Sequence, residues 1–292
     1  MAVFGVIGGL LLAGGFVYYT APNEPAFDGR SLSSWLTEWS GSYFDRTNAA
    51  AGAIRSIGTN GLPLLLSWVS KDESPMQKKV FRSASRFIPD SLNPISRYEW
   101  RPLIAAKALN LLGSQAMPAF PVLTNLMTKR EHQLEAATAL VGMGSDGIAV
   151  LTKAVTNGDV LLRLFTAMAL EDAQSDFDKV IPALIESAKL GGKKPEDYMA
   201  RRAAGTTLVK LHKEPNLVVP AFASFLTNQD EHIRYLGASL LVDFGAEARI
   251  AIPLLRQAET NSDPNVREAA TNVIKEINAN EGKIHDDAHA GT

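Results

Sequence analysis

Six consecutive residues, Gly142-Met143-Gly144-Ser145-Asp146-Gly147, have the spacing of a dinucleotide-binding turn. Such a turn follows a β-strand and opens a helix, so that backbone amides at the helix start can hold a pyrophosphate. The preceding residues 134–141 instead have the composition of a helix, and similar glycines close other helices of this chain. We therefore interpret the segment as a turn between helices and predict no cofactor.

Histidine is the second residue type here that could support catalysis or metal binding. His285 and His289 stand four residues apart, which on a helix would place two imidazoles on one face. They lie in a polar segment without an apolar face, so residues 280–292 are predicted to form a disordered tail. His132 and His232 each follow a glutamate near the start of a predicted helix and are expected at the surface.

Known catalytic patterns are absent from the sequence. There is no cysteine, which excludes disulfides, thiol catalysis and cysteine-ligated metals. No His-Glu-x-x-His, Gly-x-Ser-x-Gly or phosphate-loop pattern occurs. The formal net charge is −2 without a long run of like charges, which argues against a dedicated nucleic-acid binder. We predict that the protein is not an enzyme and uses no metal or cofactor.

The best candidate for a binding site is a basic and aromatic insertion near residues 72–100. It stretches the interval between Pro63 and Pro121 to 58 residues. Arg, Trp and Tyr are enriched at protein-binding hot spots, and the basic residues also suit an anionic partner. The alternative is a helix whose aromatic rings pack inward while its basic side chains are merely solvated. The candidate partner-binding residues are Lys78, Lys79, Arg82, Arg86, Arg97, Tyr98, Trp100 and Arg101.

Residues 1–20 are predicted to form a membrane anchor. Ala2 to Tyr19 carry no charge, and 18 residues span about 27 Å as a helix, close to the thickness of a bilayer core. A cleaved signal peptide and a buried soluble helix are the alternatives, but no basic residue precedes the apolar run. Because almost no tail precedes the anchor, we expect the large domain to be extracytoplasmic, in the periplasm. Anchors could also dimerise through the small residues Gly5, Gly9 and Ala13.

The rest of the chain consists of repeated pairs of helices. Glycines close several of the first helices, because glycine readily adopts the left-handed backbone that ends a helix. The second helices open with an apolar residue and a Pro, whose missing amide hydrogen has no partner in a first turn anyway. The glycines are Gly58, Gly113, Gly144 and Gly245, and the prolines are Pro63, Pro121, Pro182, Pro220 and Pro253. Other first helices end at Gln174, His212 and Asn278; Asn tolerates the left-handed backbone well, and we expect differently built turns at Gln and His.

A third mark precedes the first helix of the last four pairs. An Asp is followed four residues later by an Arg and three residues after that by a small residue. The Asp is expected to cap the helix, and the Arg to pair with it along the helix surface. The spacings between the Asp residues are 38, 33 and 33, a period typical of α-solenoids. These positions are Asp159, Arg163, Asp197, Arg201, Asp230, Arg234, Asp263 and Arg267.

These marks resemble HEAT repeats, especially the short bacterial kind related to the phycobilisome-lyase HEAT-like repeats. The resemblance covers about Thr47 to Ala279 and is strongest at Asp263 to Ala270. Phe27 to Trp39 resembles the opening helix of membrane-anchored bacterial proteins with this repeat, whose pattern Gly29, Arg30, Leu32, Trp35 and Leu36 follow. The resemblance implies a fold and a binding role. Enzymatic relatives modify bilin pigments, but no catalytic residue set transfers to these positions.

We therefore predict an all-α protein, a right-handed α-solenoid of HEAT-like helical pairs with an N-terminal transmembrane or signal helix. The anchor (1–20) and a linker (21–30) precede a cap helix (31–46), whose stripe of Leu and Trp either covers the first repeat or binds a partner. The solenoid covers residues 47–279. The expected function is a membrane-tethered scaffold that binds a protein on the concave face of the second helices. The alternatives are nucleic-acid or anionic-polymer binding along a basic groove and, less favoured, a bilin-lyase-like enzyme.

Overall fold

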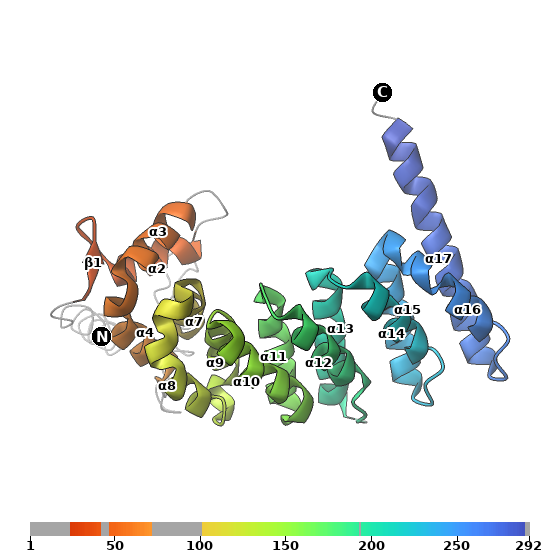
Figure 1. The fold of residues 1–292 in the computed structure, drawn as a ribbon, viewed down its shortest axis with the longest axis horizontal. Helices are drawn as coiled ribbons and strands as arrows, with labels where there is room; N and C mark the ends of the chain where they lie inside the picture. Colours follow the sequence, from red (N-terminus) through yellow and green to blue (C-terminus); the bar gives the residue numbers. More distant parts are fainter. Residues whose placement is uncertain (1–23, 42–46, 72–100, 193, 290–292) are drawn as a thin grey trace, which may run out of the picture. The chain divides into compact units, whose positions relative to one another are not determined.

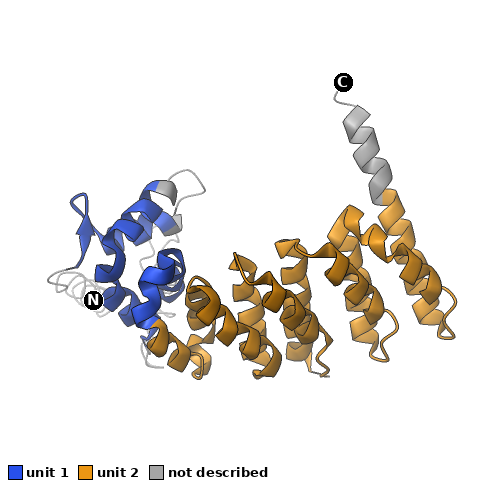
Figure 2. Cartoon of the chain, viewed as in Figure 1, with its two compact units in different colours: residues 1–119 blue, residues 120–292 orange. Residues whose placement is uncertain are grey.

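The computed structural model describes residues 24–41, 47–71, 101–192 and 194–289; at residues 40, 41, 47, 48 and 280–289 it describes the backbone alone. Over this part of the chain the fold is helical, with one sheet of two short strands. The predicted all-α class is thereby confirmed. The chain divides into two compact units, residues 1–119 and residues 120–292, shown in blue and orange in Figure 2.

The described part of unit 1 opens with a β-hairpin that the sequence analysis assigned to a linker. Strand β1 (Ala26–Phe27) pairs antiparallel with β2 (Arg30–Ser31). The two turn residues both have positive φ, 50° at Asp28 and 71° at Gly29. A two-residue hairpin turn of the Asp-Gly type requires this backbone. Strands of two residues are too short for an alternating pattern, which explains why the sequence did not reveal them.

Four α-helices follow in the described part of unit 1, and the apolar stripe of the first one is largely buried. Leu32, Trp35 and Leu36 are all less than a tenth exposed, whereas Trp39 is half-buried. The Trp35 indole Nε1 donates to the carbonyl of Phe27 at 3.1 Å, so the hairpin folds back on this helix. The elements are α2 (Leu32–Gly41), α3 (Thr47–Ile57), α4 (Leu62–Val69) and α7 (Arg101–Leu112), with 3-10 turns η1 (Gly58–Gly61) and η3 (Gly113–Ala119); α2 packs on α3 and α7.

Unit 2 consists of helices in pairs (Figure 1). The first helices are α9 (Gln133–Val141), α11 (Val160–Ala169), α13 (Pro195–Leu211), α15 (Glu231–Phe244) and α17 (Pro264–His289). The second helices are α8 (Phe120–Leu126), α10 (Gly144–Asn157), α12 (Phe177–Lys189), α14 (Pro215–Phe225) and α16 (Ile252–Ala258). Three 3-10 turns connect them, η4 (Arg130–His132), η5 (Leu170–Asp172) and η6 (Gly245–Ala251).

Contacts in unit 2 run from each helix to its near neighbours in the chain. The first helices pack in the order α9, α11, α13, α15 and α17, and the second helices α10, α12, α14 and α16 pack in a parallel row. Each second helix also packs on the first helix of the next pair, as α10 does on α11 and α14 on α15. The core is therefore a continuous layer between the two rows, filled by Leu, Val, Ile and Ala.

The predicted left-handed turns are confirmed at the glycines. Gly58, Gly113, Gly144 and Gly245 all have positive φ. His212 adopts the left-handed backbone too, with φ 49°, so the prediction of a differently built turn is wrong there and α13 ends without a glycine. Asn278 closes no helix, because α17 continues through it to His289. The helix thus occupies the first part of the predicted tail; no Pro interrupts it, and propagating an existing helix is easier than starting one.

Two of the five prolines do not open their helices as predicted. Pro63, Pro121 and Pro253 are each the second residue of a helix. Pro182 and Pro220 lie inside α12 and α14, which begin five residues earlier. The reason is that the segment before these prolines forms α-helix, whereas η1, η3 and η6 precede the other three as 3-10 turns.

The membrane anchor proposed for residues 2–19 lies outside the described residues. Among the helices that the structure does describe, none is both long and apolar enough to cross a bilayer.

Candidate partner-binding face

The insertion that carries most of the predicted binding residues lies outside the described part of the chain. This applies to Lys78, Lys79, Arg82, Arg86, Arg97, Tyr98 and Trp100. Arg101 is described and is the first residue of α7. Its guanidinium carbon lies 4.9 Å from the centre of the Trp68 ring on α4, an interaction inside unit 1. Arg101 therefore contributes to the packing of α4 on α7.

The second helices of unit 2 share one pattern of burial around the position that the repeat gives to Pro. We number this position 0; it is Pro121, Ala149, Pro182, Pro220 and Pro253 in α8, α10, α12, α14 and α16. Position +2 is buried in all five helices, and position −1 is buried or half-buried. Positions 0, +1 and +4 are exposed or half-exposed in every helix. These three positions lie on one face of each helix. We call the surface that they form on the five helices the second-helix face.

The second-helix face has two parts with different chemistry. Positions 0 and +1 form an apolar stripe: besides the residues at position 0, it contains Val122, Val150, Ala183, Ala221 and Leu254. Val122 and Leu254 are 42% and 43% exposed. Position +4 forms a polar row of Asn125, Lys153, Glu186, Ser224 and Gln257, all exposed. In unit 1, α4 repeats the pattern with Pro63, Leu64 and Ser67.

Charge is sparse and balanced on the second helices. Helices α8 and α14 contain no charged residue, and α16 contains Arg256 alone. Helices α10 and α12 carry both signs. A basic groove would need Lys and Arg from successive pairs; α10 and α12 supply lysines, but α8 and α14 supply no basic residue.

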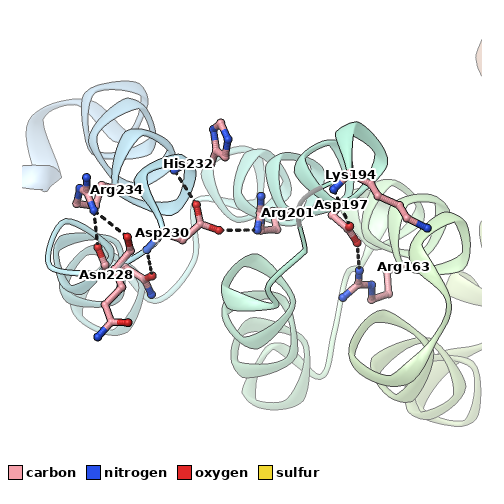
Figure 3. Close-up of polar contacts among 9 residues, drawn as sticks. Arg163, Lys194, Asp197, Arg201, Asn228, Asp230, His232 and Arg234 are labelled. Atoms are coloured by element: carbon pink, nitrogen blue, oxygen red, sulfur yellow. Dashed lines mark hydrogen bonds and ion pairs between the residues drawn. The ribbon is translucent and has the colours of Figure 1, made fainter.

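The first helices carry a ladder of ion pairs, and its pairing corrects the prediction. Arg163, Arg201 and Arg234 each contact the Asp of the following pair, and not the Asp four residues before it; Figure 3 shows the first two of these contacts. Arg163 Nη2 lies 3.2 Å from Asp197 Oδ1, and Arg201 Nη1 lies 3.3 Å from Asp230 Oδ2. Arg234 Nη2 lies 4.0 Å from Asp263 Oδ2. The Asp carboxylates are turned toward the start of their own helix, so the guanidinium of the preceding pair approaches them from the other side.

The Asp residues also cap helices, as predicted. Asp159 Oδ1 accepts from the amides of Leu161 and Leu162 at 3.0 and 3.1 Å. Asp230 accepts from the amide of His232 at 2.9 Å. Asp197 differs: it is the third residue of α13 and accepts from the amide of Lys194 at 3.2 Å. One carboxylate thus serves a helix start and an Arg of the previous pair.

Gln133 takes the place of the Arg in the first of these pairs. Its Nε2 donates to the carbonyl of the residue six positions earlier, Met127, at 3.4 Å. Arg234 and Arg267 donate to the residues six positions earlier in the same way, at 2.9 and 2.8 Å. Gln133 is buried, and its Oε1 has no hydrogen-bond partner. The sequence analysis missed this position because Gln does not match the Asp-to-Arg mark.

The small residue that completes the mark is required by close packing. In α15 this residue is Gly237, where an added Cβ would lie 2.6 Å from the Cβ of Phe225 and 2.8 Å from the carbonyl oxygen of Phe222. Both contacts belong to α14. A residue with a side chain at this position would therefore force α14 and α15 apart.

The turns that join the helices hold two further contacts between neighbouring pairs. Asp176 accepts from Ser145 Oγ at 3.0 Å and from Lys179 Nζ at 2.7 Å. The hydrogen bond from Lys179, followed by those from Ser175 and Ser145, lowers the pKa of Asp176 below its usual value. His212 stacks on Phe244, with ring centres 4.8 Å apart, and its Nε2 pairs with Glu247.

The Gly-rich segment and the histidines, the other motifs that could support chemistry, are located as follows. Helix α9, and not a strand, precedes Gly142–Gly147; the segment comprises the turn after α9, as predicted, and the start of α10 from Gly144. His232 is exposed as predicted, but His132 is 4% exposed, because η4 packs against α9. The side chains of His285 and His289 lie outside the described residues. Within the described residues no group of three or more His, Asp or Glu is placed to hold a metal ion.

Comparisons with known proteins add little to this picture. No family model and no curated protein matches the chain. Among solved structures, it is similar to a crystal structure of an engineered protein from the Northeast Structural Genomics Consortium, with a TM-score of 0.37 and 17% identity. The match covers 75% of this chain and 97% of the engineered protein.

Proposed function

We propose that the protein is a non-catalytic scaffold, tethered to a membrane through residues 2–19, that binds a protein partner on the second-helix face. We also propose that its helical pairs form a right-handed α-solenoid of the HEAT-like kind. The recurring Asp, Arg, Gly and Pro marks support the solenoid, and so does the order in which the helices of unit 2 pack.

One observation carries the binding role. Positions 0 and +1, which are exposed or half-exposed, are apolar in all five second helices of unit 2, in addition to the buried side chains at position +2. Apolar side chains that recur on the accessible face of a folded protein commonly mark a site of interaction. The few charges on these helices favour a protein over a nucleic acid as the partner.

Photo-crosslinking with the full chain tests this proposal. A photoreactive phenylalanine analogue is placed at Val122 or Leu254 on the second-helix face, and at Met199 or Tyr235 on the first helices as matched controls. The controls are 54% and 67% exposed, so they are at least as accessible. We expect adducts with protein from the second-helix positions alone, and we expect them to persist after nuclease treatment and at about 0.5 M salt. Adducts from the control positions alone would contradict the proposed face, and adducts that nuclease removes would favour the anionic polymer.

A further inference from the structure

The chemistry of the second-helix face narrows the class of partner. We propose that this face binds an extended, polyproline-like segment of a protein, which presents one apolar side chain per three residues and places an acid and a base against α10 and α12. This inference rests on the proposed function and deepens it. It draws on the apolar stripe, the polar row and the two charges that the polar row contains.

The spacing of the apolar stripe favours a period of three residues. Second helices that pack side by side, as α10, α12, α14 and α16 do, stand about 8–10 Å apart. A polyproline II segment advances about 9.3 Å in each turn of three residues. It can therefore present one side chain to each helix in succession. A β-strand brings side chains to one face about every 6.6 Å and would lose this register after one helix.

The polar row favours an extended backbone over a helical one. Asn125 and Gln257 offer side-chain amide groups beside the apolar stripe, whereas the Ser224 hydroxyl donates to the carbonyl of Ala221 in its own helix. A polyproline II backbone has no internal hydrogen bonds, so its carbonyl and amide groups need such partners. In a helical partner the backbone carbonyl and amide groups are already hydrogen-bonded within the helix. The side-chain amides of the polar row would then find no backbone groups to bind.

Two charges in the polar row make the match specific. Lys153 on α10 and Glu186 on α12 occupy the same repeat position on helices that contact each other. Both are exposed, and within the described residues neither is in an ion pair. A segment that runs along the face complements them with an acidic residue near Lys153 and a basic residue one triplet away, near Glu186. The order of the two charges then selects one sequence of the segment over its reverse.

The test uses two synthetic peptides and the full chain. Each fluorescent peptide contains five Pro-Pro-Leu triplets, with one Pro of the second triplet and one of the third replaced by Asp and Lys in one peptide, and by Lys and Asp in the other. Binding is measured by fluorescence anisotropy. We expect the wild-type chain to prefer one order by about threefold, the size of an exposed ion pair. The double variant Lys153→Glu/Glu186→Lys is expected to prefer the other order.

Controls separate this inference from the proposed function. Ala221→Asp and Leu254→Asp, which place a charge in the apolar stripe, are expected to weaken peptide binding at least tenfold, by about 1.4 kcal/mol or more. Met199→Asp and Tyr235→Asp place the same charge on the first helices and should leave binding within about twofold. Failure of both peptides to bind, an unchanged preference in the double variant, or tighter binding of an amphipathic helical peptide would overturn the inference. Protein crosslinks from Val122 and Leu254 would still support the proposed function in each of these cases.

Discussion

Arg201 on α13 and Asp230 at the start of α15 form an ion pair with 3.3 Å between Nη1 and Oδ2, although the Arg201 side chain is only 1% exposed. A guanidinium taken out of water in this way needs the opposite charge close by. The Nε of Arg201 has no partner, so Asp230 supplies its main compensation. This contact joins two successive helical pairs and makes their packing sensitive to a single carboxylate.

Asp230→Asn should therefore destabilise the protein by about 3 kcal/mol, the scale for an unpaired buried charge. Asn is as good a helix cap as Asp, so the change removes the charge and keeps the cap. Urea unfolding followed by circular dichroism measures the effect. The control is Glu171→Gln, in an exposed ion pair with Lys210, for which we expect less than about 0.5 kcal/mol. Equal effects of the two substitutions would show that Arg201 does not depend on the charge of Asp230.

The ladder can also be extended by one pair. Gln133→Arg places a guanidinium at the first position of the ladder, where Asp159 starts the following pair. We expect an increase in the free energy of unfolding of up to about 1 kcal/mol, because Asp159 is exposed and the pair is partly solvated. Combining it with Asp159→Asn provides the control. The prediction is wrong if the gain survives in the double variant, because the new Arg would then act without Asp159.

Close packing of α14 on α15 gives a third prediction. Gly237→Ala adds a methyl group against Phe225 and the backbone of Phe222, and overpacking of this kind costs about 1–3 kcal/mol. The matched control is Gly52→Ala in α3, where an added Cβ meets nothing within 4 Å. That substitution should stabilise its helix by about 0.5–1 kcal/mol. Thermal unfolding compares the two, and a neutral Gly237→Ala would show that the two helices can move apart freely.

Asp176 gives a dependence of stability on pH. Its pKa is lowered in the folded state, chiefly by the hydrogen bond from Lys179, so its stabilising contribution is present above the unfolded pKa of 3.8 and is lost as the pH falls below it. The pKa of Lys179 is raised by the same contact, so that contribution is present below 10.5 and is lost at higher pH. We expect the stability difference between wild type and Asp176→Asn to be constant near neutral pH and to shrink at both extremes.

Asn suits the left-handed backbone of Asp176, where φ is 55°, so this variant changes the charge and leaves the turn intact. Lys179→Met should reproduce most of the same pH dependence, because Lys179 is the largest cause of the lowered pKa. Chemical unfolding at a series of pH values between 2 and 11 measures both variants. A difference that stays constant down to the lowest pH would contradict the assignment.

The repeat predicted those features that depend on local sequence. A Gly after an Ala-rich helix predicted the positive φ of Gly113 and Gly144, because few other residues adopt that backbone easily. The same periodicity, read from each Pro, places the residue two positions later in the core. The same periodicity contains the apolar stripe and the polar row, since positions 0, +1 and +4 lie on one face of each second helix.

Other features depend on distances between pairs, which a single repeat does not contain. An Asp and an Arg four residues apart can pair on one helix, so the sequence did not show that Arg163 would contact Asp197 of the next pair. The starts of α12 and α14 were misplaced because a Pro is compatible with a first turn but does not require one. His212 has a left-handed backbone and stacks on the ring of Phe244, which lies 32 residues later in the chain. A local sequence pattern does not contain this contact.

The order of contacts in unit 2 has a mechanical consequence. No large body of contacts ties α9 directly to α15 or α17, so a small rotation at one junction is carried forward and added to the next. The second-helix face should therefore lengthen or shorten through small changes at every junction. A ligand that contacts several second helices at once would depend on the sum of these changes, so tension along the molecule would alter the affinity for that ligand.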